Sequence, residues 1–542
     1  DGATLSPGGT GAAPGTLTIN GDLSLASGST LTYSFGQANV VGGAFNDLTQ
    51  VGGNLRLGGT LNAVVSPGGA SEAGVYRVFS YGGTLDNQGL ALGAMPSKSV
   101  FVQTSVANQV NLVATTGEPL NFWDGAAGPK NNAAVNGGDG VWQNVLGNDH
   151  WTEVSGVANA PFANGAYAVF MAQPGAVRVD NSLGQVNVSG MQFASDGYRV
   201  DGDGIALVGA QRTPVRVGDG SALGAGYTAT INAVLSGTSS LEKLDLGTLV
   251  LGGANTYSGG TAVNGGVLQV AVDASLGAES GPRAVEAGTL RTTASYATAR
   301  ATPHDVGGGT RETPAGVALT HAGVISGAGA LTKSGGGTVV LAGSNAYGGP
   351  THVTAGTLRA GTAGAFSPAS AHTVARGATL DTAGFNQRVA SLDNGGTVSL
   401  VGAKAGSTLV VSGPYSARSL LRVGTGLAGG MPVSDRLVID GAGFGASGHT
   451  TIEIATLGGL GAPTLGNGIE VISGINGATT TAQTTKGAFA LANGHVDVGA
   501  YEYRLYAADL QGAGENWYLR TTAEPPPLPP LEGNAPPERP PQ

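Results

Sequence analysis

The sequence predicts an all-β solenoid, in which short strands stack coil upon coil along the chain. Three observations predict it: a Gly-rich phrase recurs at constant length, apolar residues advance by nearly constant steps, and the composition disfavours helices. Gly supplies 96 of the 542 residues. Glycine is costly inside helices, whereas Val, Leu, Ile and Thr between glycines suit strands joined by tight turns. A hydrophobic content of 41% argues against a disordered chain.

The repeated phrase reads "GTLVLGGANTYSGGTAVNGGVLQV" over Gly247–Val270 and "GTVVLAGSNAYGGPTHVTAGTLRA" over Gly337–Ala360. Seven residues keep the same offset in and just before the two copies. They are Lys243, Leu251, Asn255, Tyr257, Thr261, Val263 and Leu268 in the first and Lys333, Leu341, Asn345, Tyr347, Thr351, Val353 and Leu358 in the second. A phrase of fixed length indicates units that stack on one another.

Two series of apolar residues give the expected register of the stack. The first is Leu249, Leu268 and Leu290, with steps of 19 and 22 positions, and the second is Val339, Leu358, Leu380 and Val398, with steps of 19, 22 and 18. We expect each residue to lie inward and to rest on its counterpart in the next coil, about 4.8 Å away. We expect one continuous solenoid across most of residues 1–522.

The corners of the coils explain the glycines, because tight turns often need a positive φ and stacked coils leave little room for side chains. The segment "NTYSGG" (Asn255–Gly260) is expected to be such a corner, with Asn255 able to bond its own backbone. Residues 119–227 are less regular and hold Trp123, Trp142 and Trp151, so longer loops are expected to project there.

Charge and cysteine content narrow the function classes. The formal net charge is −10 without any cluster of Lys and Arg, which disfavours a nucleic-acid partner. The absence of cysteine fits either a reducing cytosol or a chain that is exported unfolded. The chain opens on Asp1 without an initiator Met or a signal sequence, which suggests a fragment or a processed piece.

The phrase "LTKSGGGTVVLAGSNAYGGPTHVTAGTLRAG" (Leu331–Gly361) resembles the passenger-associated repeat of type V autotransporters, and Leu241–Ala271 is a more divergent copy. "FWDG" (Phe122–Gly125) and "DGYRVDGDGIALVG" (Asp196–Gly209) resemble the module that commonly precedes such repeats. The resemblance implies a right-handed parallel β-helix, displayed at the cell surface or outer membrane of a Gram-negative bacterium or secreted after cleavage.

The C-terminal stretch is similar to the end of pertactin-type passengers, which implies an autochaperone role in folding after export. It runs through "SDRLVIDG" (Ser434–Gly441), "VDVGAYEYRLYA" (Val496–Ala507) and "ENWYLRTT" (Glu515–Thr522). Aromatic residues are dense there, and we expect a hairpin-like cap that covers the last coil and nucleates folding. The alternative is that the aromatic residues only shield a sheet edge from aggregation. The residues expected to build it are Phe444, Tyr501, Tyr503, Tyr506, Trp517 and Tyr518.

An echo of this end module occurs near the start of the chain. "NDLTQVGGNLRLGGTLNAVV" (Asn46–Val65) parallels "SDRLVIDG", "YRVFSYGGTL" (Tyr76–Leu85) parallels "IEVISG" (Ile469–Gly474), and "VNLVAT" (Val110–Thr115) parallels "WYLRTT".

The segment Ala523–Gln542 has nine prolines in twenty positions and no apolar periodicity, so an extended linker is expected. In the family that it resembles, such a linker precedes a membrane barrel. The predicted organisation is a β-helix segment at 1–118, a less regular β-helix module with loops at 119–237, a β-helix with repeats at 238–430, a cap at 431–522 and the linker at 523–542.

A search for catalytic or metal-binding residues predicts none. "GTSS" (Gly237–Ser240) lacks the continuation of a protease nucleophile turn, and no G-x-S-x-G elbow occurs. "DGDG" (Asp201–Gly204) lacks the third oxygen ligand of a calcium loop. The histidines show no metal spacing and His352 is expected to be an exposed side chain between strands. They are His150, His304, His321, His352, His372, His449 and His495.

We therefore expect no catalytic, cofactor-binding or metal site, no cofactor and no enzymatic activity. The predicted function is that of a surface adhesin or virulence-associated structural passenger. Its expected partners are a host cell surface or extracellular matrix, other copies on neighbouring cells, and an outer-membrane β-barrel translocator after the linker. The alternative is the stalk of an autotransporter enzyme, a protease or esterase whose catalytic domain lies upstream of Asp1.

Overall fold

The computed structural model shows short strands and glycine corners, as the sequence predicts. It describes residues 2–9, 13–38, 40–71, 74–96, 100–104, 108–114, 120–129, 132, 134–144, 148, 150–152, 154, 156, 159–160, 162–281, 283–285, 287–427 and 432–521. The chain divides into two compact units, 1–349 and 350–542. The predicted linker at 523–542 lies outside the described residues.

Within these ranges the only helices are two 3-10 turns, Ala222–Gly226 and Asp273–Leu276. No helix in this part of the chain is both long and apolar enough to cross a bilayer.

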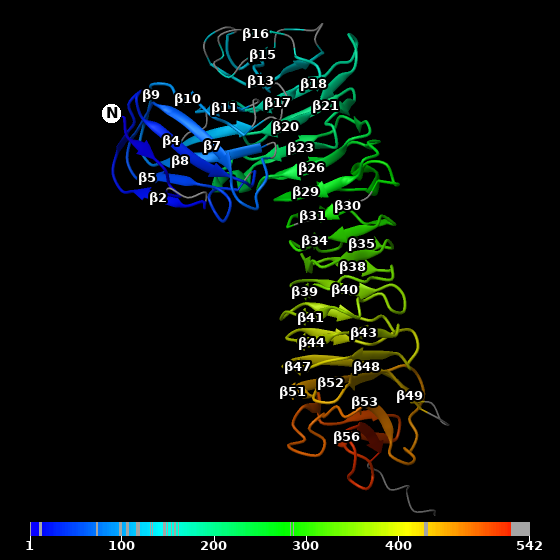
Figure 1. Ribbon diagram of the computed structural model, residues 1–542. Coiled ribbons are helices and arrows are strands. Elements are labelled where there is room, and N and C mark those ends of the chain that lie inside the picture. The colour runs from blue at the N-terminus through cyan, green and yellow to red at the C-terminus, as the bar shows by residue number, and fades with distance from the viewer. Residues whose placement is uncertain are drawn as a thin grey trace, which may run out of the picture. The chain divides into compact units, whose positions relative to one another are not determined.

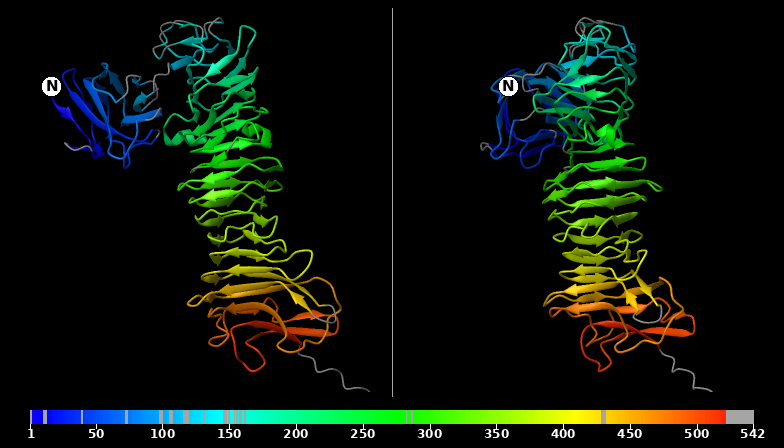
Figure 2. Two further views of the ribbon diagram at one scale, coloured as in Figure 1. Left: turned by 45° about the vertical axis from the view of Figure 1, so that its right-hand side comes forward. Right: turned by 90° about the vertical axis from the view of Figure 1, so that its right-hand side faces the viewer.

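Residues 2–114 form three sheets, which run along the sides of a short β-helix (Figure 2). The first is β1(Thr4–Leu5)-β4(Thr30–Phe35)-β7(Thr60–Val65)-β10(Ala91–Leu92), and the second is β3(Leu23–Ser24)-β6(Leu55–Leu57)-β9(Leu85–Asn87). The third is β2(Thr16–Ile19)-β5(Leu48–Val51)-β8(Gly74–Tyr81)-β12(Gln109–Ala114)-β11(Val100–Gln103). All pairs are parallel except those made by β12, which is antiparallel to both β8 and β11.

Residues 120–349 form longer stacks that also belong to the first unit (Figure 1). One sheet is β16(Asn159–Ala160)-β15(Trp151–Thr152)-β13(Leu120–Trp123)-β17(Tyr167–Phe170)-β20(Gly190–Phe193)-β23(Arg212–Val217)-β26(Ser240–Leu244)-β28(Thr261–Val263)-β30(Arg283–Val285). A second is β14(Gly140–Trp142)-β18(Ala176–Val179)-β21(Arg199–Gly202)-β24(Thr228–Ile231)-β27(Thr248–Leu251)-β29(Val267–Val270)-β31(Thr289–Thr292)-β34(Gly309–Glu312)-β37(Leu331–Ser334). Shorter stacks are β19(Val186–Val188)-β22(Ile205–Leu207)-β25(Leu235–Ser236), β32(Tyr296–Thr298)-β35(Ala318–His321)-β38(Thr338–Leu341) and β33(Thr302–His304)-β36(Ile325–Gly327).

The strands of the second unit also lie in three stacks. They are β39(Thr351–Val353)-β41(Ala371–Val374)-β44(Ser391–Asn394)-β47(Tyr415–Ala417)-β51(Ala446–Gly448) and β40(Thr357–Ala360)-β42(Thr379–Asp381)-β45(Thr397–Ser399)-β48(Leu420–Gly426)-β52(Thr450–Thr456)-β54(Phe489–Leu491), with β49(Val433–Ser434) antiparallel to β48. The third is β43(Gln387–Val389)-β46(Thr408–Val411)-β50(Arg436–Asp440)-β53(Ile469–Ile475)-β57(Trp517–Thr521)-β56(Tyr501–Ala507)-β55(Val496–Val498), in which the last three strands are antiparallel. The protein is thus an all-β parallel β-helix, and the predicted hairpin-like end is confirmed.

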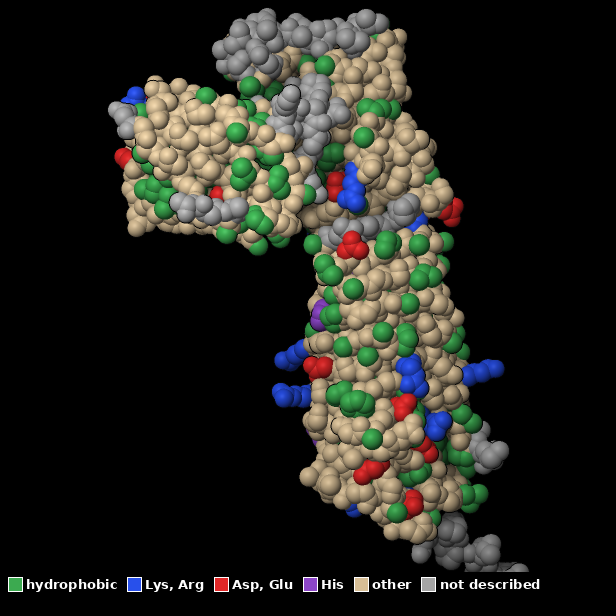
Figure 3. Space-filling model, in the orientation of Figure 1, with side chains coloured by type: hydrophobic (Ala, Val, Ile, Leu, Met, Phe, Trp, Pro, Cys, Tyr) green, Lys and Arg blue, Asp and Glu red, His purple; other side chains and the backbone are tan. Residues whose placement is uncertain are grey.

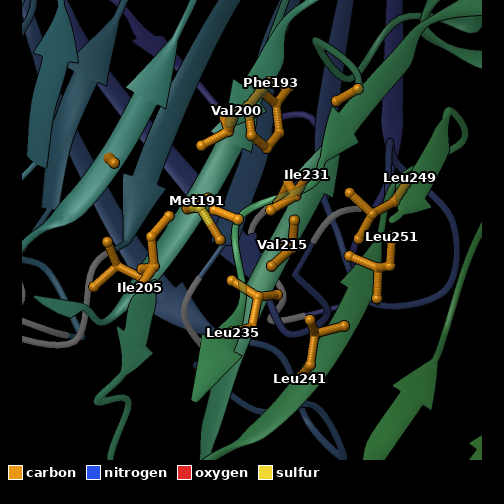
Figure 4. Packing of buried hydrophobic residues seen from close by; sticks show 14 of the residues in the cluster. Met191, Phe193, Val200, Ile205, Val215, Ile231, Leu235, Leu241, Leu249 and Leu251 are labelled. Carbon is orange, nitrogen blue, oxygen red and sulfur yellow. The ribbon is translucent and has the colours of Figure 1, made fainter. Parts of the chain in front are cut away.

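The apolar ladders have the predicted register. Leu249 pairs with Leu268 and Leu268 with Leu290, and all three are fully buried. In the second unit Leu358, Leu380 and Val398 form the same kind of ladder. Val339 belongs to the first unit, where it pairs with Leu319. The interior of residues 123–290 is a continuous apolar column, part of which is drawn in Figure 4 around Met191, Phe193 and Leu249.

The sequence predicts one continuous solenoid across most of residues 1–522, and residues 2–114 are the part that does not join it. No described strand of residues 2–114 pairs with a described strand of residues 120–349, and each part has its own buried cluster. Strands at both boundaries run against the stack: β12 is antiparallel to β8, and β15 is antiparallel to β13. An antiparallel strand changes the direction of the sheet edge, so a parallel coil cannot continue the stack in the same register.

Three tryptophans explain the irregular start of the longer β-helix. Trp123, Trp142 and Trp151 are at most 1% exposed and pack with ring centroids 5.0–5.2 Å apart across the Trp123–Trp151 and Trp142–Trp151 contacts. They build a cap inside the first coils, rather than lying in loops. Parts of the segments in which projecting loops were expected, such as 145–147 and 157–158, lie outside the described residues.

Candidate functional site

The repeated residues of the two phrases all point into the coil. All fourteen are buried: Lys243, Leu251, Asn255, Tyr257, Thr261, Val263, Leu268, Lys333, Leu341, Asn345, Tyr347, Thr351, Val353 and Leu358. The repeated residues therefore stabilise the stacking of the coils, and the polar residues among them make their contacts inside the coil.

The asparagine of each phrase ties successive coils together. Asn255 Oδ1 accepts a hydrogen bond from Leu235 N at 2.8 Å, and Asn255 Nδ2 donates to Ser275 O at 2.6 Å. In the second copy, Asn345 Oδ1 accepts from Ile325 N at 2.7 Å. Asn255 is bonded to neighbouring coils rather than to its own backbone, because a coil about twenty residues long places backbone groups of the neighbouring coils within closer reach.

The lysine of each phrase is a buried cation that satisfies carbonyl groups at a corner. Lys243 Nζ donates to Leu244 O and Asp245 O at 2.8 Å and to Gly265 O at 3.2 Å. Lys333 Nζ donates to Ser334 O and Gly335 O at 2.7 Å. Burial lowers the pKa of Lys243 to about 7 and that of Lys333 to about 8.

The free energy of unfolding of the first unit is expected to rise between pH 7 and pH 9.5. Lys243 is expected to contribute on the order of 2 kcal/mol to this rise. The unfolded chain holds this proton up to about pH 10.4, whereas folded Lys243 loses it near pH 7, so deprotonation favours folding across that window. The charges that act on it are Asp245, which opposes the shift, and Arg216, which adds to it. Denaturant titrations of wild type and Lys243→Met at both pH values measure the effect. Lys333 is common to both proteins, and equal pH slopes would contradict the assignment.

The last coils contain a buried carboxylate that accepts hydrogen bonds from two other segments of the chain. Asp435 is fully buried and directly precedes β50. Its Oδ1 accepts from Gly406 N at 2.9 Å, Ser407 N at 2.8 Å and Ser407 Oγ at 2.9 Å, and its Oδ2 accepts from Gly424 N at 2.9 Å. The donors lie 11 to 29 residues away in the chain, so the side chain fastens one coil to the coil before it.

The antiparallel strands that follow close the core of the second unit. Trp517 is 3% exposed and packs edge-on against Phe489 at 5.3 Å, while its Nε1 donates to Thr480 Oγ1 at 2.8 Å. Tyr503 is 1% exposed and donates to Ala462 O at 2.8 Å. Phe444 and Tyr506 were expected to join this cover, but each keeps 37% of its surface exposed.

The short motifs that resemble catalytic or calcium-binding segments have structural partners. Ser239 is buried and its Oγ accepts from Thr213 Oγ1 at 2.9 Å. Asp201 pairs with Arg199 at 2.7 Å, and Asp203 Oδ2 accepts from Asn181 N at 2.9 Å. These groups are used for coil corners and strand ends.

The histidines are not gathered into one site. His304, His321 and His372 are buried, and His352 lies within β39, half-buried, rather than between strands. His372 Nδ1 lies 3.0 Å from Ser370 O, and burial lowers the pKa of His372 to about 4, which keeps it neutral. His495, Asp497 and Glu502 offer ligand atoms within 4.8 Å of one another, but Arg504 already neutralises Glu502 and the group is open to solvent.

The outer surface carries few charges, and many of them pair between coils. Arg291 lies opposite Glu312 in the strand register with an N–O distance of 3.0 Å, and Arg422 lies opposite Glu453 at 2.9 Å. Pairs of this kind contribute about 0–1 kcal/mol each. Figure 3 shows a face dominated by backbone and uncharged polar atoms, with charged side chains scattered over it.

The aspartate at the end module was not singled out from the sequence. Its signal was present as the shared Asp in "SDRLVIDG" and "NDLTQVGG", one residue before a strand in each echo. The partners could not be predicted, because the donors belong to other coils.

Family models match two parts of the chain. The passenger-associated-transport-repeat matches residues 241–270 and 331–360, which confirms the two predicted repeats. The autochaperone domain type 1 matches residues 388–505. That match begins before the cap predicted at 431, and it includes the donors of the Asp435 bonds at residues 406, 407 and 424.

Two relatives are autotransporters by name. The chain is 43% identical over 536 residues to the adhesin BmaC autotransporter of Brucella suis biovar 1 (strain 1330), which covers 96% of this chain and 15% of that protein. It is 37% identical over 136 residues to the probable autotransporter YfaL of Escherichia coli (strain K12), covering 25% of this chain and 10% of that protein. The chain thus spans a small part of the length of these relatives.

Among solved structures, the Haemophilus influenzae Hap adhesin aligns with 94% of this chain and 59% of its own, at 10% identity and a TM-score of 0.29. The repeats, the autochaperone domain and the autotransporter relatives place the chain at the cell surface or outer membrane of a Gram-negative bacterium. The chain is a segment of an autotransporter passenger, with passenger-associated transport repeats and a type 1 autochaperone domain.

Proposed function

We propose that this passenger segment is a surface adhesin, a β-helix that carries uncharged polar surface away from the bacterial cell. The observation that carries the proposal is the 43% identity to a protein named an adhesin, which extends over 96% of this chain. The geometry supports an adhesive role, because the repeated residues are buried between coils and the outer face remains open for contact with a partner.

The partners proposed for this surface are a host cell or the extracellular matrix, with self-association between cells as a further route. The translocator proposed for export is an outer-membrane β-barrel that follows the proline-rich segment. The net charge of −10 favours neutral or positively charged receptors over polyanions.

Purified chain is expected to bind saturably to at least one member of a panel of host cells and matrix proteins. Fluorescently labelled chain at increasing concentration measures binding, and unlabelled folded chain in excess should compete while heat-unfolded chain should not. Sedimentation of the chain alone tests self-association. Absence of both saturable binding and self-association would contradict an adhesive role for this segment.

We also propose that the segment has no catalytic activity of its own. In the described residues, the side chains of the serine and aspartate motifs are bonded at coil corners and strand ends, where they have structural partners. Incubation with peptide and ester substrates tests this. A turnover that disappears on one Ser or Asp substitution would overturn it.

A further inference from the structure

Residues 15–114 repeat the architecture of residues 407–521, strand for strand. In each case one sheet contains three parallel strands followed by two antiparallel ones, and the outermost of these precedes its neighbour in the chain. The order is β2-β5-β8-β12-β11 in the first segment and β46-β50-β53-β57-β56 in the second, where β55 adds one more strand.

The registers coincide as well as the order. Three pairs in the first segment have counterparts at equivalent positions in the second. Thr16–Leu48 corresponds to Thr408–Arg436. Likewise, Thr30–Thr60 corresponds to Leu420–Thr451, and Thr49–Phe79 corresponds to Leu437–Ile472. An antiparallel contact follows at equivalent places, Phe35 with Asn46 and Thr425 with Ser434.

The closing strands share an irregularity that simple stacking does not require. Each antiparallel ladder skips one residue of the inner strand, Val78 of β8 and Val471 of β53, and both valines are fully buried. The pairs that flank the bulge are Phe79–Val110 and Arg77–Asn111 in the first ladder and Ile472–Trp517 and Glu470–Tyr518 in the second. A bulge bends its strand at a set place, so its recurrence marks a shared design of the end.

The buried aspartate recurs at the same place. Asp47 is 1% exposed and directly precedes β5, as Asp435 precedes β50. Its Oδ1 accepts from Gly15 N and its Oδ2 accepts from Ser34 N, both at 2.6 Å. These donors are the counterparts of Ser407 and Gly424 in the register above, so both carboxylates fasten the same two strands.

We propose that residues 15–114 are a second autochaperone-type module, which folds and unfolds independently of residues 120–521 and can close a parallel β-helix. The family model assigns this module only at residues 388–505. Independence is supported by the separate buried cluster and by the absence of a shared sheet among the described residues. The two parts also meet at a side-chain contact, in which Arg77 Nη2 donates to Gly220 O at 3.1 Å. The edge of β2 is equivalent to that of β46, which accepts β43 in the second unit, so β2 can accept a parallel coil in the same way.

The first experiment is hydrogen exchange on the full chain carrying Asp47→Asn. Exchange of the backbone amides in β5, β8 and β12 is expected to quicken roughly 100-fold. The substituted side chain loses the charge-assisted hydrogen bonds, and its NH2 group faces the N–H of Gly15 or Ser34, which is also a donor. Exchange in residues 162–281 should be unchanged. The matched control is Asp86→Asn, whose side chain is 59% exposed, with expected changes of only a few fold. Equal quickening in both regions, or none in β5, would overturn the proposal.

The second experiment tests closure by exchanging the modules. In one full-length variant residues 407–521 are replaced by a copy of residues 15–114, and in another they are deleted. We expect amides of residues 350–406 to keep their protection in the exchange variant and to lose roughly tenfold or more in the deletion variant. Asp47→Asn in the transplanted copy should remove the protection again. Equal exchange of residues 350–406 in the two variants would contradict the closing role.

Discussion

Asp435→Asn is expected to lower the free energy of unfolding of the second unit by about 3 kcal/mol. The carboxylate accepts four hydrogen bonds at full burial, and no basic side chain pairs with it among the described ion pairs. An amide at this place presents an N–H to donors that already point inward, so at least one backbone N–H is left buried without an acceptor. Hydrogen exchange of the amides in β46, β50 and β53 at increasing denaturant measures the loss in this unit.

The matched control is Asp497→Asn, in the same module but with its side chain 68% exposed, for which a change below about 1 kcal/mol is expected. Refolding rates decide whether the module also nucleates folding. Slower refolding of Asp435→Asn would place the fastened coils in the folding transition state, whereas faster unfolding alone would make them a late, passive cap. A loss no larger than that of the control would contradict the role assigned to Asp435.

The sequence predicts the interior of the coils well, because stacking imposes a local and periodic constraint. Leu249, Leu268 and Leu290 had to lie one coil apart, and a shift of one residue would have turned them to solvent. The structure pairs them in that register. The Lys, Asn and Tyr of the phrase were recognised as recurring residues, but their burial was not predicted, because a polar side chain is buried only when partners in other coils are available.

The ends of the stacks could not be predicted in the same way. A strand alternates apolar and polar residues whether its neighbour is parallel or antiparallel, so the sequence of β12 does not reveal that it reverses the sheet at residue 109. The continuous solenoid expected from the repeated grammar therefore fails between residues 114 and 120. The similarity between the two end modules was visible in the sequence. Only the structure shows that they share the strand register and the bonds made by the two buried aspartates.

The two antiparallel ends differ in what covers the core. The first module ends on Leu112 and Val110, the second on Trp517 and Leu519, and the longer β-helix of the first unit begins under β15 with Trp151. A solenoid exposes its apolar interior wherever the stack of coils ends. Each end must therefore be covered either by side chains larger than those inside the coils or by a strand that crosses the end. The tryptophans meet this need at the start of the stack.

Trp151→Ala is accordingly expected to destabilise the first coils of residues 120–349 by about 4 kcal/mol. The side chain is 1% exposed and its ring lies 4.6 Å from Phe162, 5.0 Å from Trp142 and 5.2 Å from Trp123 between ring centroids. Removing it opens a cavity beneath the antiparallel strand β15. Hydrogen exchange of β13, β17 and β20 should quicken most, with a smaller effect at β31, because each coil contacts only its neighbours.

Trp151→Phe separates the contribution of the ring from that of its N–H. Trp151 Nε1 is buried, and no described residue accepts a hydrogen bond from it, so phenylalanine removes a buried donor while it keeps most of the aromatic contact. A loss of about 1 kcal/mol or less is expected for this variant, well below that of alanine. If both variants quickened exchange equally along the whole stack, Trp151 would act through global stability, and the local cap would be ruled out. If neither changed exchange at β13, the aromatic cluster would not be what closes this end, and β15 would hold the edge through its backbone bonds alone.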